Sequence, residues 1–242
     1  MPAPAFVHLR LHSEFSVIDG VVRLDEVVKA AEADGQGALA LTDGANMFGA
    51  VRFYKAARAR GVKPILGVDA WVTNDADRDQ PYRLLLLAAD RAGYLNLCAL
   101  LSRAWLENPY RGRGELRAEW LARSSEGLIA LSGGPAGEVG VHLAGGRREA
   151  ARSAAQRLAQ CFSDRFYLEL QRAGRAGDAA LVKATVALAV ELDLPVVATH
   201  PVQYLRPEDF RAHEARVCIA EGETLGDPRR PIGSFLFLGP TG

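Results

Sequence analysis

The chain has 242 residues, of which 49% are hydrophobic, and its 29 basic and 29 acidic side chains give a formal net charge of zero. This balance argues against a strongly basic nucleic-acid-binding module, and no apolar run reaches the roughly 18 residues of a membrane span. The N-terminus lacks the features of a signal peptide, and the three cysteines are scattered, so we expect a reduced cytoplasmic globular protein with no membrane association.

Apolar runs of strand length recur along the chain and alternate with segments of helical periodicity. The expected strands are residues 6–9, 38–42, 64–72, 83–89, 127–132, 165–170 and 195–199. The expected helices are residues 24–35, 46–61, 93–107, 149–162, 178–192 and 208–221. Most strand runs are continuously apolar, which is typical of parallel strands covered on both faces.

Seven strands that alternate with helices predict an α/β protein with a parallel sheet. The count fits either an open doubly wound sheet or a barrel. No Gly-x-Gly-x-x-Gly motif follows the first strand, so the dinucleotide-binding fingerprint is absent from that position.

Polar residues gather where the expected strands end, and in βα barrels the active site is built from those ends. After the first strand come His8, Arg10, His12, Ser13, Ser16 and Asp19. The later strands contribute Thr42-Asp43-Gly44, Asp69, Ser132-Gly133-Gly134, Glu169, Gln171-Arg172 and Thr199-His200-Pro201. We expect these residues to converge in one cleft. Imidazole and carboxylate groups there can bind zinc, manganese or magnesium, and a hydrogen-bonded polar rim without an ion is the alternative.

The stretch from Phe6 to Gly20, FVHLRLHSEFSVIDG, resembles the opening motif of a PHP (polymerase and histidinol phosphatase) domain. It is most similar to the form found at the N-terminus of the bacterial replicative DNA polymerase III alpha subunit. Further matches follow in order at ALALTD (38–43), GAVRFY (49–54), GVKPILG (61–67), EGLIALSGG (126–134), FYLEL (166–170), LPVVAT (194–199) and HEAR (213–216).

The resemblance implies a distorted seven-stranded βα barrel of the TIM-like kind, with residues 1–230 as one PHP domain. It also implies a parent protein several times longer, because the family's polymerase carboxylates match no residue of this chain. Nucleotidyl transfer would belong to the missing sequence.

The metal ligands of active PHP domains are only partly matched by this chain. The family's His-x-His pair falls on Arg10 and His12, and its Thr-Asp-His falls on Thr42-Asp43-Gly44. Its last Asp-x-His-like pair falls on Pro201 and Gln203, with His200 one place earlier. Glycine and proline side chains offer no donor atom, and a guanidinium stays protonated and cannot coordinate.

We therefore predict a vestigial cleft without catalytic residues, in which Arg10 replaces the metal as a fixed charge paired with Asp19, Asp43 or Asp69. Its members are His8, Arg10, His12, Asp19, Asp43, Asp69, Arg172, His200 and Gln203. No cofactor is expected; a single weakly bound ion on His12, Asp69 and His200 is the alternative.

The resemblance implies a non-catalytic replication scaffold that docks the proofreading exonuclease subunit and the rest of the polymerase, and that meets DNA through the parent protein. The alternative is a metal-dependent phosphoesterase that uses manganese, zinc or magnesium on pyrophosphate or DNA 3′ ends. A third hypothesis, a nucleic-acid-binding module, predicts affinity that falls steeply with salt.

The tail, residues 231–242, departs from this resemblance. Residues 230–242, RPIGSFLFLGPTG, resemble instead the strand and loop that open the second ATPase module of a Clp-type AAA+ chaperone. Gly239-Pro240-Thr241-Gly242 would begin a Walker A loop, but the Gly-Lys-Ser/Thr that reaches the phosphates is missing. We therefore expect no ATP binding.

Overall fold

The computed structural model describes residues 6–225, so the predicted tail of residues 231–242 and the end of the predicted 1–230 domain lie outside the described residues. The strands are β1 (Ala38–Leu41), β2 (Lys63–Val72), β3 (Tyr82–Ala88), β4 (Pro109–Tyr110), β5 (Arg113–Leu116), β6 (Leu128–Leu131), β7 (Phe166–Gln171) and β8 (Val196–Thr199). The α-helices are α1 (Leu24–Ala33), α2 (Ala50–Ala59), α3 (Arg91–Glu107), α4 (Ala118–Leu121), α5 (Glu138–Ala144), α6 (Arg148–Cys161), α7 (Asp178–Leu192) and α8 (Phe210–Glu221). Two short 3-10 helices complete the set, η1 (Gly134–Ala136) and η2 (Pro207–Asp209).

The strands close into a distorted barrel, as the resemblance to PHP domains implies. The sheet runs β1-β2-β3-β6-β7-β8. The extended segment of residues 8–12, called the first segment below, joins the two ends of this sheet. On one side of that segment, the carbonyl oxygens of His8 and Leu11 accept hydrogen bonds from Ala40 and Thr42. On the other side, Val202, just after β8, exchanges backbone hydrogen bonds with Arg10 and His12. Six regular strands and one irregular segment thus form the seven-membered ring.

One part of the sequence prediction is wrong, because the sheet is not all parallel. β3 runs antiparallel to β2 and to β6. Only nine residues, 73–81, connect β2 to β3, whereas a parallel crossover needs a dozen or more residues and usually a helix. The hairpin of β4 and β5 is also new, because it lies in a part of the chain for which the sequence predicts neither strand nor helix. Its turn is made by Arg111 and Gly112, both at positive φ, which matches the twist of a tight hairpin.

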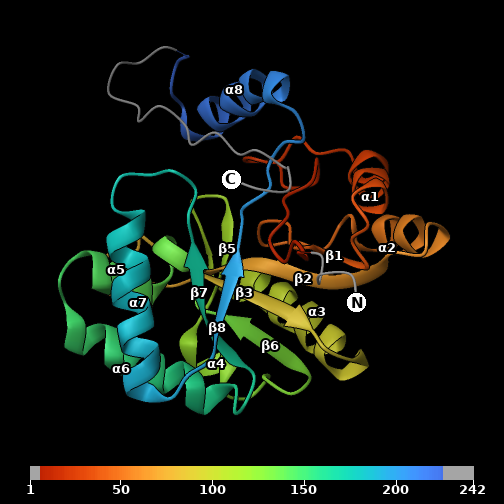
Figure 1. The fold of residues 1–242 in the computed structure, drawn as a ribbon. Helices are drawn as coiled ribbons and strands as arrows, with labels where there is room; N and C mark the ends of the chain where they lie inside the picture. Colours follow the sequence, from red (N-terminus) through yellow and green to blue (C-terminus); the bar gives the residue numbers. More distant parts are fainter. Residues whose placement is uncertain (1–5, 226–242) are drawn as a thin grey trace.

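The apolar side chains form two layers around the sheet. Outside the barrel, α3, α5, α6 and α7 cover one flank, and α1 and α2 cover the other (Figure 1). Inside, a small cluster of Ala40, Leu85, Leu87 and Leu131 fills the lower part of the barrel. The run Leu84–Leu87 is continuously apolar because its alternate residues belong to the outer and inner layers. No helix within residues 6–225 is long and apolar enough to cross a membrane.

Gly93 at the start of α3 packs directly on the backbone of Gly127, which precedes β6. A Cβ atom at Gly93 would overlap the carbonyl oxygen of Gly127. We expect Gly93→Ala to lower the free energy of unfolding by about 2 kcal/mol, because the backbone contact must open. Gly37→Ala is the matched control, since a Cβ there meets no atom within 4 Å. Urea denaturation of both variants measures the difference, and equal stabilities would contradict this account of the α3–β6 contact.

Candidate functional site

A cleft of about 600 Å³ opens at the end of the barrel where β2, β7 and β8 carry their polar side chains. Each of these strands turns alternate side chains inward, so the polar positions follow the apolar ones that fill the barrel below. The polar residues that line the cleft include Arg10, His12, Asp19, Asp69, Arg83, Gln171 and Gln203. The sequence-predicted convergence of strand-end residues is therefore present for these positions.

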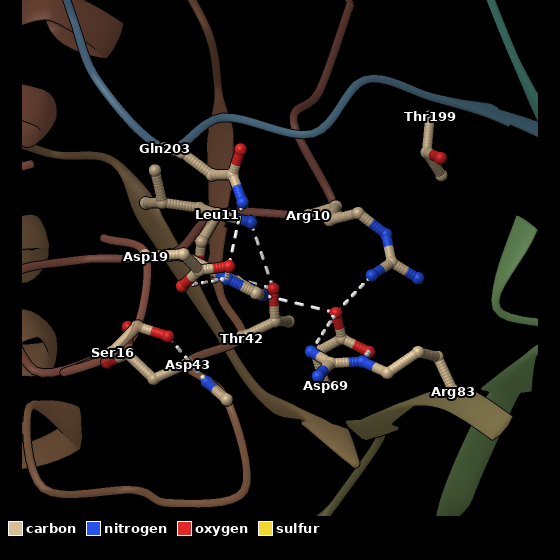
Figure 2. Close-up of polar contacts among 12 residues, drawn as sticks. Arg10, Leu11, Ser16, Asp19, Thr42, Asp43, Asp69, Arg83, Thr199 and Gln203 are labelled. Atoms are coloured by element: carbon tan, nitrogen blue, oxygen red, sulfur yellow. Dashed lines mark hydrogen bonds and ion pairs between the residues drawn. The ribbon is translucent and has the colours of Figure 1, made fainter. Parts of the chain in front are cut away.

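Arg10 lies at the centre of this group and is 6% exposed. Its guanidinium donates two parallel hydrogen bonds to Glu169, from Nε to Oε1 at 2.9 Å and from Nη2 to Oε2 at 3.0 Å. Its remaining Nη1 donates to Asp69 Oδ2 (Figure 2). Burial by itself lowers the pKa of Arg10, but the charges of Asp69 and Glu169 outweigh it and hold the pKa above its ordinary value. The side chain is thus a permanent buried cation between two carboxylates.

Asp69 on β2 accepts hydrogen bonds from three cationic side chains. Besides Arg10, it accepts hydrogen bonds from Arg83 Nε at 3.1 Å and from His12 Nε2 at 3.1 Å. The Arg83 guanidinium carbon lies over the Trp71 ring, 3.9 Å from its centroid, and this contact helps to hold the guanidinium against Asp69. Burial alone would raise the pKa of Asp69, yet Arg10 and Arg83 hold it well below its ordinary value.

His12 is bound at both ring nitrogens. Its Nδ1 lies 2.8 Å from Asp19 Oδ2, and its Nε2 contacts Asp69. Burial opposes the charged form, but Asp19 outweighs it, and the pKa of His12 rises to about 9. The ring is therefore an imidazolium at neutral pH, with both N–H groups donating. Gln203 completes the site of Asp19 by donating to Oδ2 at 2.7 Å.

Glu169 on β7 is a central residue of the charge cluster that was expected at the strand ends but was not among the predicted members of the vestigial cleft. Thr199 donates to Glu169 Oε1, and the side-chain amide of Gln171 donates to the same oxygen at 2.7 Å. The sequence pattern placed Glu169 among the strand-end residues but gave it no partner. Its signal was a lone carboxylate in an apolar strand, and such a group requires a buried cation. Arg83 carries the same signal, because it shares one strand face with Leu85 and Leu87.

Asp43, a predicted member of the cleft, is used to hold the loop after the first segment. Its two oxygens accept hydrogen bonds from the backbone N–H of Ser13 at 2.6 Å and from the Ser13 hydroxyl at 2.9 Å. Burial raises the pKa of Asp43 above its ordinary value. Among the described residues, the ion-pair partners of Arg10 are Asp69 and Glu169, so the predicted pairing is realised with Asp69 and not with Asp43 or Asp19.

Besides Asp43, three predicted residues do not line the cleft. His8 faces a smaller pocket on the outside of the barrel, and His200 lies close enough for its charge to lower the pKa of His8 further, beyond the effect of burial. Arg172 is exposed. The reason is the irregular first segment: without regular strand alternation, His8 turns to the opposite side from Arg10 and His12. His12, Asp69 and His200 were the residues predicted to bind a single ion. His12 and Asp69 line the cleft and His200 does not, so the three residues are not gathered at one site.

The residues present do not fit the metal cluster that the resemblance implies. A cation already occupies the space between Asp69 and Glu169, both nitrogens of His12 donate to carboxylates, and Gly44 and Pro201 supply no ligand atoms. Within residues 6–225 no group of three or more His, Cys, Asp or Glu side chains is arranged to hold a metal ion. The cluster instead has three cations (Arg10, His12, Arg83) and three carboxylates (Asp19, Asp69, Glu169), so its charges cancel.

Comparison with known proteins identifies relatives of both the sequence and the fold. The chain is 45% identical over 227 residues to DNA polymerase III subunit alpha of Pseudomonas aeruginosa, which covers 94% of this chain and 19% of that protein. It is 44% identical over 232 residues to the corresponding subunit of Escherichia coli, covering 96% of this chain and 20% of that protein. The chain thus spans about a fifth of the length of these relatives.

Among solved structures, an amidohydrolase from Chromobacterium violaceum with bound sulfate and no metal shares the fold. The TM-score is 0.51 at 17% identity, and the match covers 87% of this chain and 96% of the other. The family model of the PHP domain matches residues 8–173, which include the first segment, Asp69 and Glu169. The chain therefore belongs to the PHP domain family, as the motifs of its first segment predicted.

Proposed function

We propose that this chain is the PHP domain of a bacterial replicative DNA polymerase III alpha subunit and that its cleft is non-catalytic. The observation that carries the proposal is the position of Arg10, which bridges Asp69 and Glu169 where active relatives would need a metal ligand. A divalent ion placed there would be repelled by a cation that cannot give up its proton.

In this proposal the charge cluster holds the barrel together instead of performing hydrolysis. Arg10 in the first segment pairs with Asp69 on β2 and with Glu169 on β7. Arg83 on β3 and His12 in the first segment also pair with Asp69. Charge-assisted hydrogen bonds of this kind are short and directional, so they fix the strand ends of the distorted barrel. The result is a rigid domain within a longer polypeptide that meets DNA through its other parts.

The proposed partners are the rest of the polymerase and the proofreading exonuclease subunit, for which the domain serves as a docking site. Support comes from the similarity to alpha subunits over nearly the whole chain. Gel filtration of the 242-residue chain with the exonuclease subunit of the same genome tests the docking. Co-elution as a stoichiometric complex is expected, and separate elution of two folded proteins would contradict it.

The absence of catalysis is tested with the unaltered chain. Elemental analysis after incubation with manganese, zinc or magnesium is expected to find no stoichiometric ion, and release of phosphate from p-nitrophenyl phosphate is expected to match the buffer blank. If the chain binds stoichiometric metal and shows turnover that His12→Ala abolishes, the scaffold hypothesis is wrong and the phosphoesterase hypothesis is supported.

A variant that restores the family's ligands should regain metal binding. Arg10→His, Gly44→His, Pro201→Asp and Gln203→His return donor atoms to four positions. Pro201 and Gln203 line the cleft. A Cβ at Gly44 would lie 3.1 Å from Ser16 Oγ and 4.0 Å from Arg83 Nη2, so the Ser16 side chain must shift slightly to admit a side chain there. We expect stoichiometric uptake of zinc or manganese, lost again when His12→Ala is added. A folded variant without uptake would mean that the backbone geometry has diverged as well.

A further inference from the structure

A second pocket lies on the outside of the barrel, between α1 and the segment that follows β8. Its volume is about 160 Å³. Its lining includes the exposed residues Ala30 and Asp34. The wall is mostly apolar, and its buried apolar side chains are Leu11, Val27, Ala31, Leu39 and Val202. Of these, only Val202 also lines the large cleft, so the two cavities lie on opposite sides of the barrel wall.

The pocket exists because the last helix leaves its usual place. In a regular βα barrel a helix follows each strand and covers its outer face. After β8 the chain passes instead to η2 and α8, which lie above the cleft end of the barrel (Figure 1). Val196 and Ala198 on the outer face of β8 are exposed as a result. The flank of α1 next to β8 is thereby left open within the described part of the chain.

Two polar side chains on the pocket wall carry atoms that have no hydrogen-bond partner among residues 6–225: His8 Nδ1 and Gln36 Oε1. His8 is 8% exposed and Gln36 is 6% exposed. The amide nitrogen of Gln36 donates to Asp34 Oδ2 at 2.8 Å, and this bond fixes which end of the amide stays unpaired. Buried polar groups are nearly always paired with protein or with ordered water, so two unpaired ones in one small pocket require water or a bound group as the missing partner.

The lining defines the chemistry of that group. The mostly apolar lining disfavours a charged ligand, and the Asp34 carboxylate in it repels an anion. Gln36 Oε1 can only accept a hydrogen bond, so the bound group must donate one. A dry cavity of roughly 150 Å³ is known to hold one benzene ring. We propose that this pocket binds a compact, neutral, ring-sized group that carries one hydrogen-bond donor, which is the chemistry of a phenol.

The test uses the 242-residue chain labelled for NMR and titrated with phenol, and separately with toluene, which has the same size and no donor. We expect saturable shifts of the amides at Ala31, Gln36 and Leu205, with toluene roughly fivefold weaker because it leaves Gln36 Oε1 unpaired. Thermal unfolding of every variant confirms that it is folded.

Ala30→Phe fills the pocket from α1 and is expected to weaken phenol binding roughly tenfold. Ala33→Phe, at an exposed position of the same helix outside the pocket lining, is the matched control and should change the affinity by less than about twofold. Gln36→Leu is expected to remove the advantage of phenol over toluene, and it provides a second variant should Ala30→Phe fail to fold.

Amide shifts that do not saturate, that map to other residues, or that persist in Ala30→Phe overturn the proposal. If the pocket holds only water, the shifts do not saturate. Equal affinities for phenol and toluene in the unaltered chain also overturn it. N-acetyl-tyrosine amide distinguishes the source of the phenol group. Binding as tight as that of phenol indicates a tyrosine side chain of a peptide, and binding of phenol alone indicates a free molecule.

Discussion

Replacement of Arg10 by methionine is expected to lower the free energy of unfolding by about 3–5 kcal/mol, the range measured when one partner of a buried ion pair is removed. Methionine has a similar length and fills most of the space, so the loss measures charge and hydrogen bonding more than packing. Asp69 and Glu169 are 2% and 3% exposed. Without the guanidinium they remain as buried carboxylates with fewer donors, and urea denaturation at neutral pH measures the cost.

The matched control is Arg60→Met, because Arg60 pairs with Glu32 at 2.7 Å on the surface, where both side chains are at least 40% exposed. Exposed pairs contribute about 0–1 kcal/mol, so this variant should resemble the unaltered protein. Adding Glu169→Gln to Arg10→Met should recover part of the loss, since it removes an uncompensated charge. Equal effects of Arg10→Met and Arg60→Met would contradict a central role for Arg10 in holding the barrel.

The stability of the domain is expected to fall as the pH rises from about 6.5 to about 9, because of His12. Its pKa is about 9 in the folded protein, against 6.5 for an unperturbed histidine such as that of the unfolded chain. A raised pKa in the folded state means that the protonated ring stabilises fully below pH 6.5, and that this contribution is lost as the pH passes through the folded value. The difference corresponds to at most about 3 kcal/mol.

Urea denaturation across this pH range measures the slope, and His12→Gln provides the comparison. Glutamine can donate to one carboxylate but does not titrate, so the difference in stability between the two proteins should shrink as the pH rises. A slope that His12→Gln leaves unchanged would mean that His12 is neutral in the folded protein. One ring nitrogen would then be free to bind a metal, and the argument against a metal site would weaken.

The α/β class was predictable from the sequence because apolar periodicity reports burial directly. The barrel was implied by the resemblance to PHP domains, since the periodicity fits an open sheet equally well. Continuous runs such as 84–87 and the alternating helices indicated an α/β fold, and the ordered PHP motifs indicated its family. The direction of β3 was not predictable from its composition. A strand buried on both faces has the same apolar pattern whether it runs parallel or antiparallel, and only the length of the nine-residue connection distinguishes the two.

The candidate site was predictable in part, and the division has a clear physical cause. The sequence named Arg10, His12, Asp19, Asp69 and Gln203, and the structure brings all five to the cleft. It placed Glu169 at a strand end without a partner, and it did not assign Arg83 to that cleft. It grouped His8 and His200 with it, although the irregular first segment turns His8 outward. Strict alternation would have put His8, Arg10 and His12 on one face, so a local departure from strand geometry decided the outcome.

The sequence by itself determined that a side chain which cannot lose its proton stands among carboxylates and imidazoles, since residue type alone fixes charge and donor capacity. Only the tertiary structure decided which carboxylates that cation holds. Asp69 and Glu169 lie 59 and 159 residues away from Arg10 in the chain, and only the closure of the barrel brings both within hydrogen-bond distance. In the same structure α8 lies above the barrel, so within residues 6–225 no helix after β8 covers the outer pocket beside α1.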